Sequence, residues 1–305
     1  MGTVSALDNT SAPIAVQHLA TPSLSIQQRL YRLWRKYDVA LLGGIFFTLV
    51  LTISLFAPVF SPYDPGQRDL KNRLAEPSAV HVFGTDELGR DVLSRVIFGG
   101  RTVLSGAFAA LGLSFGIGLM IGIAAGYKGG WVDNLLMRCM DILLSFPSVL
   151  LAILVVTTLG VGQTNVIIAI SVAQIPVFAR LVRSIVLILV GQEYVTAAKS
   201  LGAHDSAIIL RHIFPNMIPP MLVQATAMLA ITIATSTALN FLGLGVETGT
   251  PDWGMMIADG QGLLFDAPHV AFFPGLCLLL TVLSVNFVGD GLRDHLDPRL
   301  RNQAG

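Results

Sequence analysis

Residues 193–216 read EYVTAAKSLGAHDSAIILRHIFPN and form a charged interruption between two long apolar stretches. Good helix formers fill this segment, which predicts one helix of about twenty residues that Pro215 ends. Small and apolar side chains recur at helical spacing and predict one apolar stripe: Tyr194, Ala197, Ala198 and Leu201. A charged helix of this kind between apolar spans indicates a surface that binds a partner protein. The alternative is a solvated loop helix that binds no partner.

The composition of the whole chain is typical of an integral membrane protein. Of its 305 residues, 53% are hydrophobic and only 12% are charged, whereas soluble domains have about 25% charged residues. The formal net charge is zero, which gives no sign of nucleic acid binding. Cys139 and Cys277 lie in apolar surroundings, so we expect two small buried residues and neither a disulfide nor a metal site.

Six stretches are long and apolar enough to cross a membrane. They are residues 39–58, 102–126, 139–159, 165–188, 217–241 and 272–290. The sequence therefore predicts an all-α integral membrane protein with six transmembrane helices. Pro147 and Pro176 are expected to bend the third and fourth of them.

Glycines four residues apart in the second span predict close helix packing. Gly112 and Gly116 fall on one helix face, and Gly118, Gly122 and Gly126 fall on another. We expect both faces to serve packing and not chemistry.

The segments at the two ends of the chain predict tails and a surface helix. Residues 1–25 are rich in Ser, Thr, Ala and Pro and lack a signal-peptide pattern, which predicts a disordered tail. Residues 26–38 combine apolar and basic faces, as an interfacial helix does; an extension of the first span is the alternative. A further external segment is expected at 59–100 and a second tail at 291–305.

The lysines and arginines predict the orientation. With both termini in the cytoplasm, most of the 19 basic residues fall on the cytoplasmic side. Residues 83–101 then lie outside, and their alternating charges predict a docking surface for a binding protein or a solvated, self-paired loop helix. The glycine-rich residues 243–271 also lie outside and predict a re-entrant piece near an outer gate or a plain connector.

No energy source can be assembled from this sequence. A proton-coupled carrier usually has ionisable groups deep in its spans, a nucleotide-driven pump needs a loop ending in Gly-Lys-Ser/Thr, and a membrane enzyme needs clustered His, Asp or Glu. We therefore expect no catalytic residue, metal or cofactor in this chain, and a partner that supplies the driving force. A stand-alone secondary transporter and a non-transporting membrane scaffold or receptor are the alternatives.

A polar stripe runs along the fifth span. It consists of Gln224, Met228, Thr232 and Thr235. Polar groups within a membrane face protein or a water-filled path, so we predict that this stripe lines a translocation route. Hydrogen bonding between helices is the alternative for each of its members.

The 193–216 segment resembles the coupling-loop signature of binding-protein-dependent ABC importer permeases, Glu-Ala-Ala-x3-Gly-x9-Ile-x-Leu-Pro. Ala197, Ala198, Gly202 and Pro215 match it. Thr196, His212 and Phe214 depart from it, and the nearby Glu193 is expected to replace part of the missing acid's role.

Three further stretches are similar to the dipeptide/oligopeptide/nickel branch of that family. They are FGTDELGRDVLSRVIFGGR (83–101), ALNFLGLGVETGTPDWGMMIADG (238–260) and GDGLRDHLDPRLR (289–301). The resemblance runs from about residue 30 to 302. It implies a type I ABC importer permease fold, with the permease domain at 101–290 and a cytoplasmic coupling helix at 193–215.

The resemblance also implies partners and site residues. The ATPase-coupling residues would be Glu193, Ala197, Ala198, Gly202, Ala203, Asp205, Arg211 and Pro215. The partners would be a second, B-type permease subunit, two ABC ATPases that bind ATP and Mg, an extracytoplasmic substrate-binding protein and the lipid of a bacterial inner membrane. The implied cargo is a dipeptide, a longer peptide, a glutathione-like thiol or a nickel chelate.

Overall fold

The computed structural model describes the backbone of residues 26–296 and the side chains of residues 39–296. This part of the chain folds into helices joined by turns, without a β-strand. The predicted tail at 1–25, part of the one at 291–305 and the side chains of the predicted interfacial helix lie outside the described residues. The backbone of residues 26–38 continues without a break into the first apolar helix.

Five helices are long. They are α1 (Ile26–Leu55), α3 (Val92–Lys128), α6 (Gln163–Val190), α9 (Phe214–Phe241) and α11 (His269–Leu296). The shorter α-helices are α2 (Ala57–Phe60), α4 (Gly130–Leu144), α5 (Ser148–Leu159), α7 (Glu193–Ser200), α8 (Asp205–Ile208) and α10 (Trp253–Gly260). Two 3-10 turns, η1 (Leu70–Asn72) and η3 (Gln261–Leu263), and one π-helical segment, η2 (Ile209–Ile213), complete the described fold.

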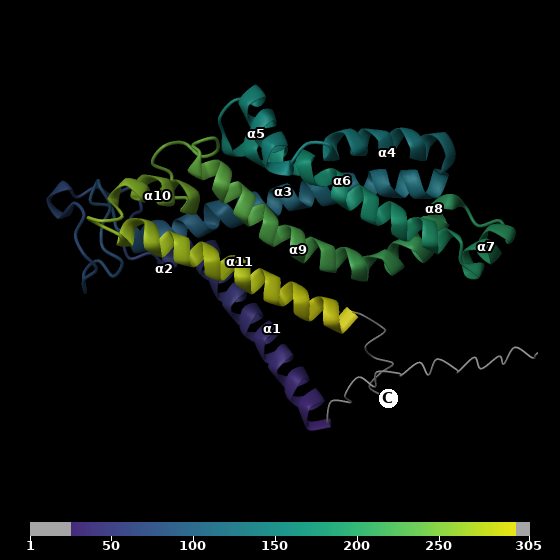
Figure 1. The fold of residues 1–305 in the computed structure, drawn as a ribbon, viewed down its shortest axis with the longest axis horizontal. Helices are drawn as coiled ribbons and strands as arrows, with labels where there is room; N and C mark the ends of the chain where they lie inside the picture. The colour runs from purple at the N-terminus through teal and green to yellow at the C-terminus, as the bar shows by residue number, and fades with distance from the viewer. Residues whose placement is uncertain (1–25, 297–305) are drawn as a thin grey trace, which may run out of the picture.

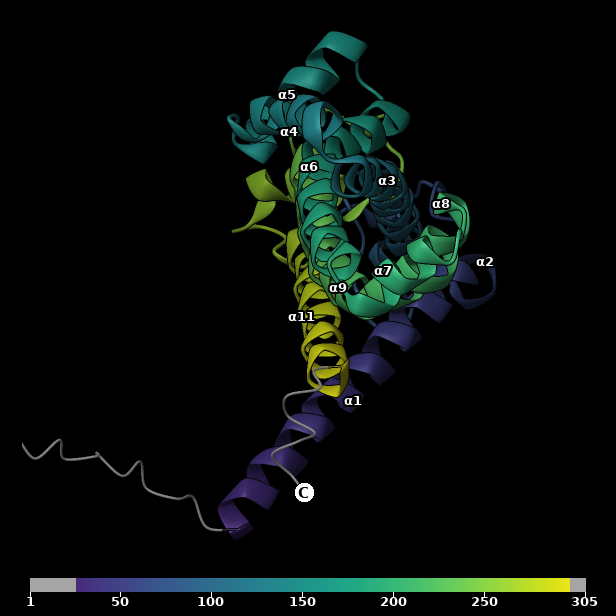
Figure 2. The same ribbon diagram turned by 90° about the vertical axis from the view of Figure 1, so that its right-hand side faces the viewer.

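The long helices set the shape of the molecule. Figure 1 shows α3, α6 and α9 running lengthwise, with α7 and α8 at one end and α10 at the other. Helices α4 and α5 lie along one side of this bundle, and α1 leaves it obliquely (Figures 1 and 2). The two segments that sequence analysis singled out, 193–215 and 83–101, therefore lie at opposite ends of α3.

The span prediction is confirmed in large part. Four helical segments are long and apolar enough to cross a membrane: Val92–Lys128, Gln163–Val190, Asp205–Phe241 and His269–Leu296. Helices α4 and α5 supply a fifth span if the bent pair is counted as one, and the apolar part of α1, Val39–Leu55, is shorter. The predicted count of six is thus not fully confirmed. Helix α6 runs unbroken through Pro176.

The third predicted span, 139–159, is wrong as one continuous helix. Helix α4 starts earlier, at Gly130, and is bent by 90° against α5. The break falls at residues 145–147 because Pro147 offers no N–H and disfavours the helical conformation at Phe146. Cys139, on α4, is exposed and Cys277 is half-buried, so the expectation that both are buried is also wrong.

One of the two predicted glycine faces packs against another helix of the chain. A Cβ atom built on Gly118 or Gly122 would come within 2.5 Å of the Cβ of Phe178 or Val182 on α6, and one on Gly126 within 2.8 Å of Val186. These distances are too short for any side chain, so α3 and α6 are in backbone-level contact. Gly112 and Gly116 have open space around the same position, so the packing expected of that face does not occur within the described chain.

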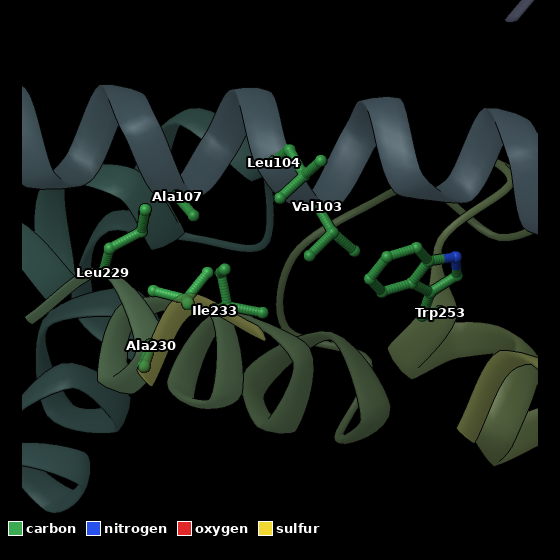
Figure 3. Close-up of a cluster of buried hydrophobic side chains, with 8 residues drawn as sticks. Val103, Leu104, Ala107, Leu229, Ala230, Ile233 and Trp253 are labelled. Carbon is green, nitrogen blue, oxygen red and sulfur yellow. The ribbon is translucent and has the colours of Figure 1, made fainter. Parts of the chain in front are cut away.

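A buried apolar cluster joins α3, α9, α10 and α11. Figure 3 shows Val103 of α3 pointing toward Ile233 of α9, with Leu104 beside it on α3 and the indole of Trp253 closing one side. The Nε1 atom of Trp253 donates a hydrogen bond of 2.8 Å to the carbonyl of Val96. This contact fixes α10 against the first turns of α3.

Candidate functional site

The 193–215 segment is two helices and not one. Helix α7 ends at Ser200, a turn follows, and α8 begins at Asp205. Gly202 in the turn has φ = +80°, a left-handed conformation that glycine adopts without steric cost. The prediction of a single twenty-residue helix is therefore wrong, because Gly202 ends it after eight residues.

The turn at Gly202 is a Schellman motif, in which a glycine just past a helix ends it. The Ala203 N–H donates to the Ala198 carbonyl at 3.1 Å, and the Gly202 N–H donates to the Lys199 carbonyl at 3.0 Å. Ala198 and Ala203 are both half-buried and pack against one apolar cluster. Three of the predicted coupling residues thus have a local structural role, which is to shape this turn.

Pro215 does not end a helix, so that prediction is wrong. It lies near the start of α9, directly after the π-helical segment, and helix continues on both sides of it. Just before it, the Phe214 N–H bonds back to the Ile209 carbonyl, five residues earlier, in the π-helical segment. Residues 205–241 consequently form one continuous helical rod, and any displacement of α8 is passed along α9.

An apolar cluster holds the segment against the bundle. Val195 of α7 and Ile208 and Ile213 after the turn are fully buried against Val182 and Val186 of α6. Burial of an aliphatic side chain of this size contributes about 1.5 to 3 kcal/mol. The inner face of the segment is therefore anchored.

The outer face of the segment is uncovered. Leu201, next to Gly202, is 88% exposed, and Tyr194 is exposed as well. The other predicted coupling residues on this face are also exposed: Glu193, Ala197, Asp205, Arg211 and Pro215. Leu201 belonged to the predicted apolar stripe but not to the predicted coupling residues, and it is the most exposed apolar side chain of the segment.

Tyr127, near the end of α3, contacts the segment on both sides of the turn. Its hydroxyl donates a hydrogen bond of 2.6 Å to Oδ1 of Asp205. The Nζ atom of Lys199 lies 4.9 Å from the centroid of its ring, which is cation–π distance. No sequence pattern marked Tyr127, because 72 to 78 residues of chain separate it from these partners.

The predicted pathway residues on α9 differ in burial. Thr232 is fully buried and exchanges hydrogen bonds of 2.9 and 3.1 Å with the amide of Gln174 on α6. Gln224, Met228 and Thr235 are half-buried. At Thr232 the described chain shows the helix–helix bonding that was the alternative; the lining role of the stripe stays a prediction.

Most of residues 83–101 are buried or half-buried, so the solvated helix offered as one alternative is wrong. A loop runs to Asp91, which begins α3 by accepting hydrogen bonds from the N–H and hydroxyl of Ser94 at 2.8 and 2.7 Å. Such an N-cap stabilises a helix start by about 1 kcal/mol. The Nδ1 atom of His81 lies 3.0 Å from the same carboxylate.

The charges in this loop pair with one another inside the protein. Asp86 accepts a hydrogen bond of 2.6 Å from Nε of Arg90, and its Oδ2 lies 3.5 Å from Nε of Arg95. Arg95 is 1% exposed and donates to the Gly249 carbonyl at 3.1 Å. The self-pairing that was predicted is present, and Glu87 is the exposed member of the group.

Residues 243–271 contain a packed helix, α10, between turns. Asp252 caps it by accepting hydrogen bonds from the N–H groups of Gly254 and Met255 at 2.8 and 3.2 Å. It also accepts one of 2.9 Å from Asn240. Burial raises the pKa of Asp252 to about 6. With Trp253 in the core, this segment is part of the fold and more than a plain connector.

Two ion pairs join α4 to α6. Arg183 pairs with Asp133, and Arg180 pairs with Asp141, each at 2.5 Å. The Asp141 pair is half-exposed and the Asp133 pair is more shielded. Among the described side chains, no group of three or more His, Cys, Asp or Glu lies close enough to hold a metal ion.

Comparison with protein families gives two matches. Residues 118–302 match the family described as binding-protein-dependent transport system inner membrane component. Residues 27–77 match the N-terminal transmembrane domain of oligopeptide transport permease C.

Named relatives cover nearly the whole chain. The dipeptide transport system permease protein of Alkalihalophilus pseudofirmus is 40% identical over 280 residues, which is 92% of each chain. The glutathione transport system permease protein of Escherichia coli O6:K15:H31 is 43% identical over 272 residues, 89% of this chain and 90% of that protein. The corresponding glutathione permease of Pectobacterium atrosepticum is 41% identical over 273 residues, 88% of this chain and 91% of that protein.

Solved structures share the fold at lower identity. The inward-facing methionine ABC transporter MetNI has a TM-score of 0.55 at 18% identity, over 67% of this chain and 96% of that chain. An amino acid ABC transporter crystallised with histidines has a TM-score of 0.52 at 14% identity, over 67% of this chain and 94% of that chain.

Proposed function

Because this chain belongs to the family of binding-protein-dependent transport system inner membrane components, we propose that it forms half of the translocation pathway of an ATP-binding-cassette importer. It is a membrane-spanning permease component with the type I permease fold. The observation that carries this function is the 40% identity, over 92% of the chain, to a dipeptide permease. A stand-alone carrier or a scaffold explains neither that match nor the exposed turn at Gly202.

We propose that the cargo is a short peptide or a related small molecule. The named relatives are permeases for dipeptides and for glutathione, which is itself a peptide. In such a system the polar stripe of Gln224, Met228, Thr232 and Thr235 would line part of the route once a second permease completes it. We expect the binding protein, and not this chain, to supply most of the selectivity.

The proposed partners are a B-type permease, two ATPases that carry the ATP and Mg, and an extracytoplasmic binding protein. The exposed turn of the 193–215 segment supports the ATPase contact, since an 88% exposed leucine beside a glycine offers an apolar anchor on an approachable backbone. This contact, together with the distribution of lysines and arginines, supports cytoplasmic termini in a bacterial inner membrane.

The proposed mechanism is a shift between two packings of the spans. ATP binding closes the ATPase pair and displaces the 193–215 segment. The displacement reaches α9 through the continuous rod 205–241 and reaches α6 through the short link at 191–192. Hydrolysis then returns the spans to the first packing. The ATPases supply differential contacts to the two states, which any such population shift requires.

Reconstitution separates this function from its alternatives. The complex with its binding protein, in proteoliposomes, should take up dipeptide or glutathione only with hydrolysable ATP on the ATPase side. The same vesicles holding this chain alone, with a proton or sodium gradient, should take up none. Uptake driven by a gradient without ATPases would establish a secondary carrier. An assembled complex that hydrolyses ATP but never transports any peptide would favour a scaffold.

Cysteine labelling tests the orientation and the ATPase contact. With Cys139 and Cys277 first replaced by serine, Leu201→Cys should form a crosslink to an ATPase subunit and react with a membrane-impermeant maleimide only in inverted vesicles. The matched control is Val80→Cys, an exposed apolar position at the opposite end of α3, which should react only from the outside. Reaction of both positions from one side would contradict the proposed topology.

A further inference from the structure

We propose that Tyr127 is a positioning residue that passes the movement of the 193–215 segment to α3. This inference rests on the proposed function and adds a third helix to the two that the chain itself links to the segment. Helix α6 enters the segment and α9 leaves it. Helix α3 has no such covalent link, because it continues from Lys128 into α4.

The position of Tyr127 relative to the turn carries the inference. Its ring lies 4.9 Å from Nζ of Lys199, three residues before Gly202. Its hydroxyl is 2.6 Å from Oδ1 of Asp205, three residues after Gly202. One side chain of α3 thus contacts the residues on both sides of the turn that carries the exposed Leu201. If the turn moves, Tyr127 must either move with it or lose these two contacts.

The hydrogen bond differs in kind from the apolar contacts around it. Phe115, Leu119 and Ile123 of α3 also pack against the cluster that holds the segment. Apolar contacts have no directional requirement and tolerate small sliding motions. A charge-assisted hydrogen bond weakens steeply when its geometry changes. The Tyr127–Asp205 bond therefore fixes where the segment stands along α3, whereas the apolar contacts hold it against the bundle.

The residue before Tyr127 on α3 shows how a displacement at Tyr127 would spread. Gly126 packs against Val186 of α6, where an added Cβ would lie 2.8 Å from the valine Cβ. Gly122 and Gly118 continue this contact for two further turns. Helices α3 and α6 are thus in close contact from Gly118 to Gly126, next to Tyr127. A displacement of Tyr127 would therefore move both helices.

The test measures peptide taken up per ATP hydrolysed in the reconstituted complex. Tyr127→Phe removes the hydroxyl and keeps the ring over Lys199, and Asp205→Ala removes the acceptor from the exposed partner. Each change should lower the ratio by about three- to tenfold, the range expected for one hydrogen bond, while ATPase activity and assembly persist. The double variant should lose no more than either single variant, because both remove the same bond.

The matched control is Tyr63→Phe. Tyr63 donates its hydroxyl to the Val80 carbonyl at 3.0 Å, so the same atom is lost from a hydrogen-bonded tyrosine far from the segment, and the ratio should not change. An unchanged ratio in Tyr127→Phe would overturn the inference. Uptake and hydrolysis that fall in proportion would overturn it too, since they indicate a merely structural role. Failure of the unaltered complex to couple uptake to ATP would instead contradict the proposed function itself.

Discussion

At one end of α3, Asp86 and Arg95 are buried and paired; at the other end, Glu193 and Arg211 are exposed. Both segments are rich in charge, and both were predicted to have a solvated helix as one alternative. The first is closed over by α10 and by the backbone near Gly249, and it serves the fold. The second buries only its inner face and leaves Leu201 uncovered. Charge density alone thus does not distinguish a structural segment from a contact surface.

The largest test of this contrast is Asp86→Ala. It removes the carboxylate shared by Arg90 and Arg95 and leaves buried guanidinium groups unpaired, which costs about 3 to 5 kcal/mol of unfolding free energy. Unfolding of the purified chain in detergent, followed by tryptophan fluorescence, measures the loss. The control is Glu87→Ala, at the exposed neighbour, with an expected change within about 0.5 kcal/mol. Equal effects would mean that the Asp86 cluster is not a structural core.

A second test uses pH at the same end. Because burial raises the pKa of Asp252 to about 6, the folded chain binds this proton more tightly than the unfolded chain does. The free energy of unfolding should therefore fall by roughly 2 to 3 kcal/mol as pH rises from about 4 to 6, and level off above that.

Asp252→Asn should remove this pH dependence. The amide keeps an acceptor for the N–H groups of Gly254 and Met255. Its NH2 group replaces the oxygen that now accepts from Asn240 Nδ2, so the Asn240 amide must turn over to place its Oδ1 as the acceptor there. Unfolding measured at several pH values should then give a variant that is more stable than the unaltered chain at pH 7. A variant that retains the slope between pH 4 and 6 would assign it to another group.

The turn at the opposite end should respond less. Gly202→Ala forces a Cβ into the left-handed conformation and should cost about 1 kcal/mol, whereas Gly202→Asn should cost only a few tenths. The control is Gly191→Ala, in the link on the other side of α7, where φ is −77° and no strain is expected. Thermal unfolding of the three variants measures the difference. Loss of uptake in Gly202→Asn with normal stability would place the glycine in the ATPase contact as well as in the turn.

The smallest effect on stability is expected at Leu201, the most exposed apolar side chain of the 193–215 segment. Leu201→Ser should change the free energy of unfolding by less than about 0.5 kcal/mol, because the side chain is 88% exposed. It should nevertheless weaken retention of the ATPases by at least about tenfold, as loss of an interface anchor does. Co-purification of the ATPases measures this. Leu264→Ser, at an exposed leucine beside α10, should retain them; equal loss in both variants would remove the contrast between the two ends.

Sequence alone predicted the apolar spans and the tight glycine face at Gly118, Gly122 and Gly126, because both follow from local periodicity. It judged the effects of two prolines only in part. Pro147 was expected to bend a span, and the chain is bent there, but by 90° and with a break between two helices. Pro215 was expected to end a helix, but the helical rod 205–241 continues through it, with a π-helical turn just before it.

The functional segments show a second limit of sequence reasoning. Burial of Arg95 depends on Gly249, which is 154 residues away, and the role of Tyr127 depends on partners more than 70 residues away. Neither pairing leaves a local pattern. The glycine at 202 did carry a local signal for a helix end, but the run of helix formers around it favoured one continuous helix.

The π-helical segment Ile209–Ile213 joins α8 to α9 and holds one residue more than a regular helical turn would. Its ring of hydrogen bonds encloses one residue more than an α-helical ring does. Deleting one of these five residues would convert the segment to regular helix and leave α8 at nearly its present rotation around the α9 axis. Inserting one residue into the regular helix that follows would instead rotate α8 by about 100° and turn Asp205 away from the Tyr127 hydroxyl. Deletion within Ile209–Ile213 should accordingly be tolerated better than insertion into the first turns of α9.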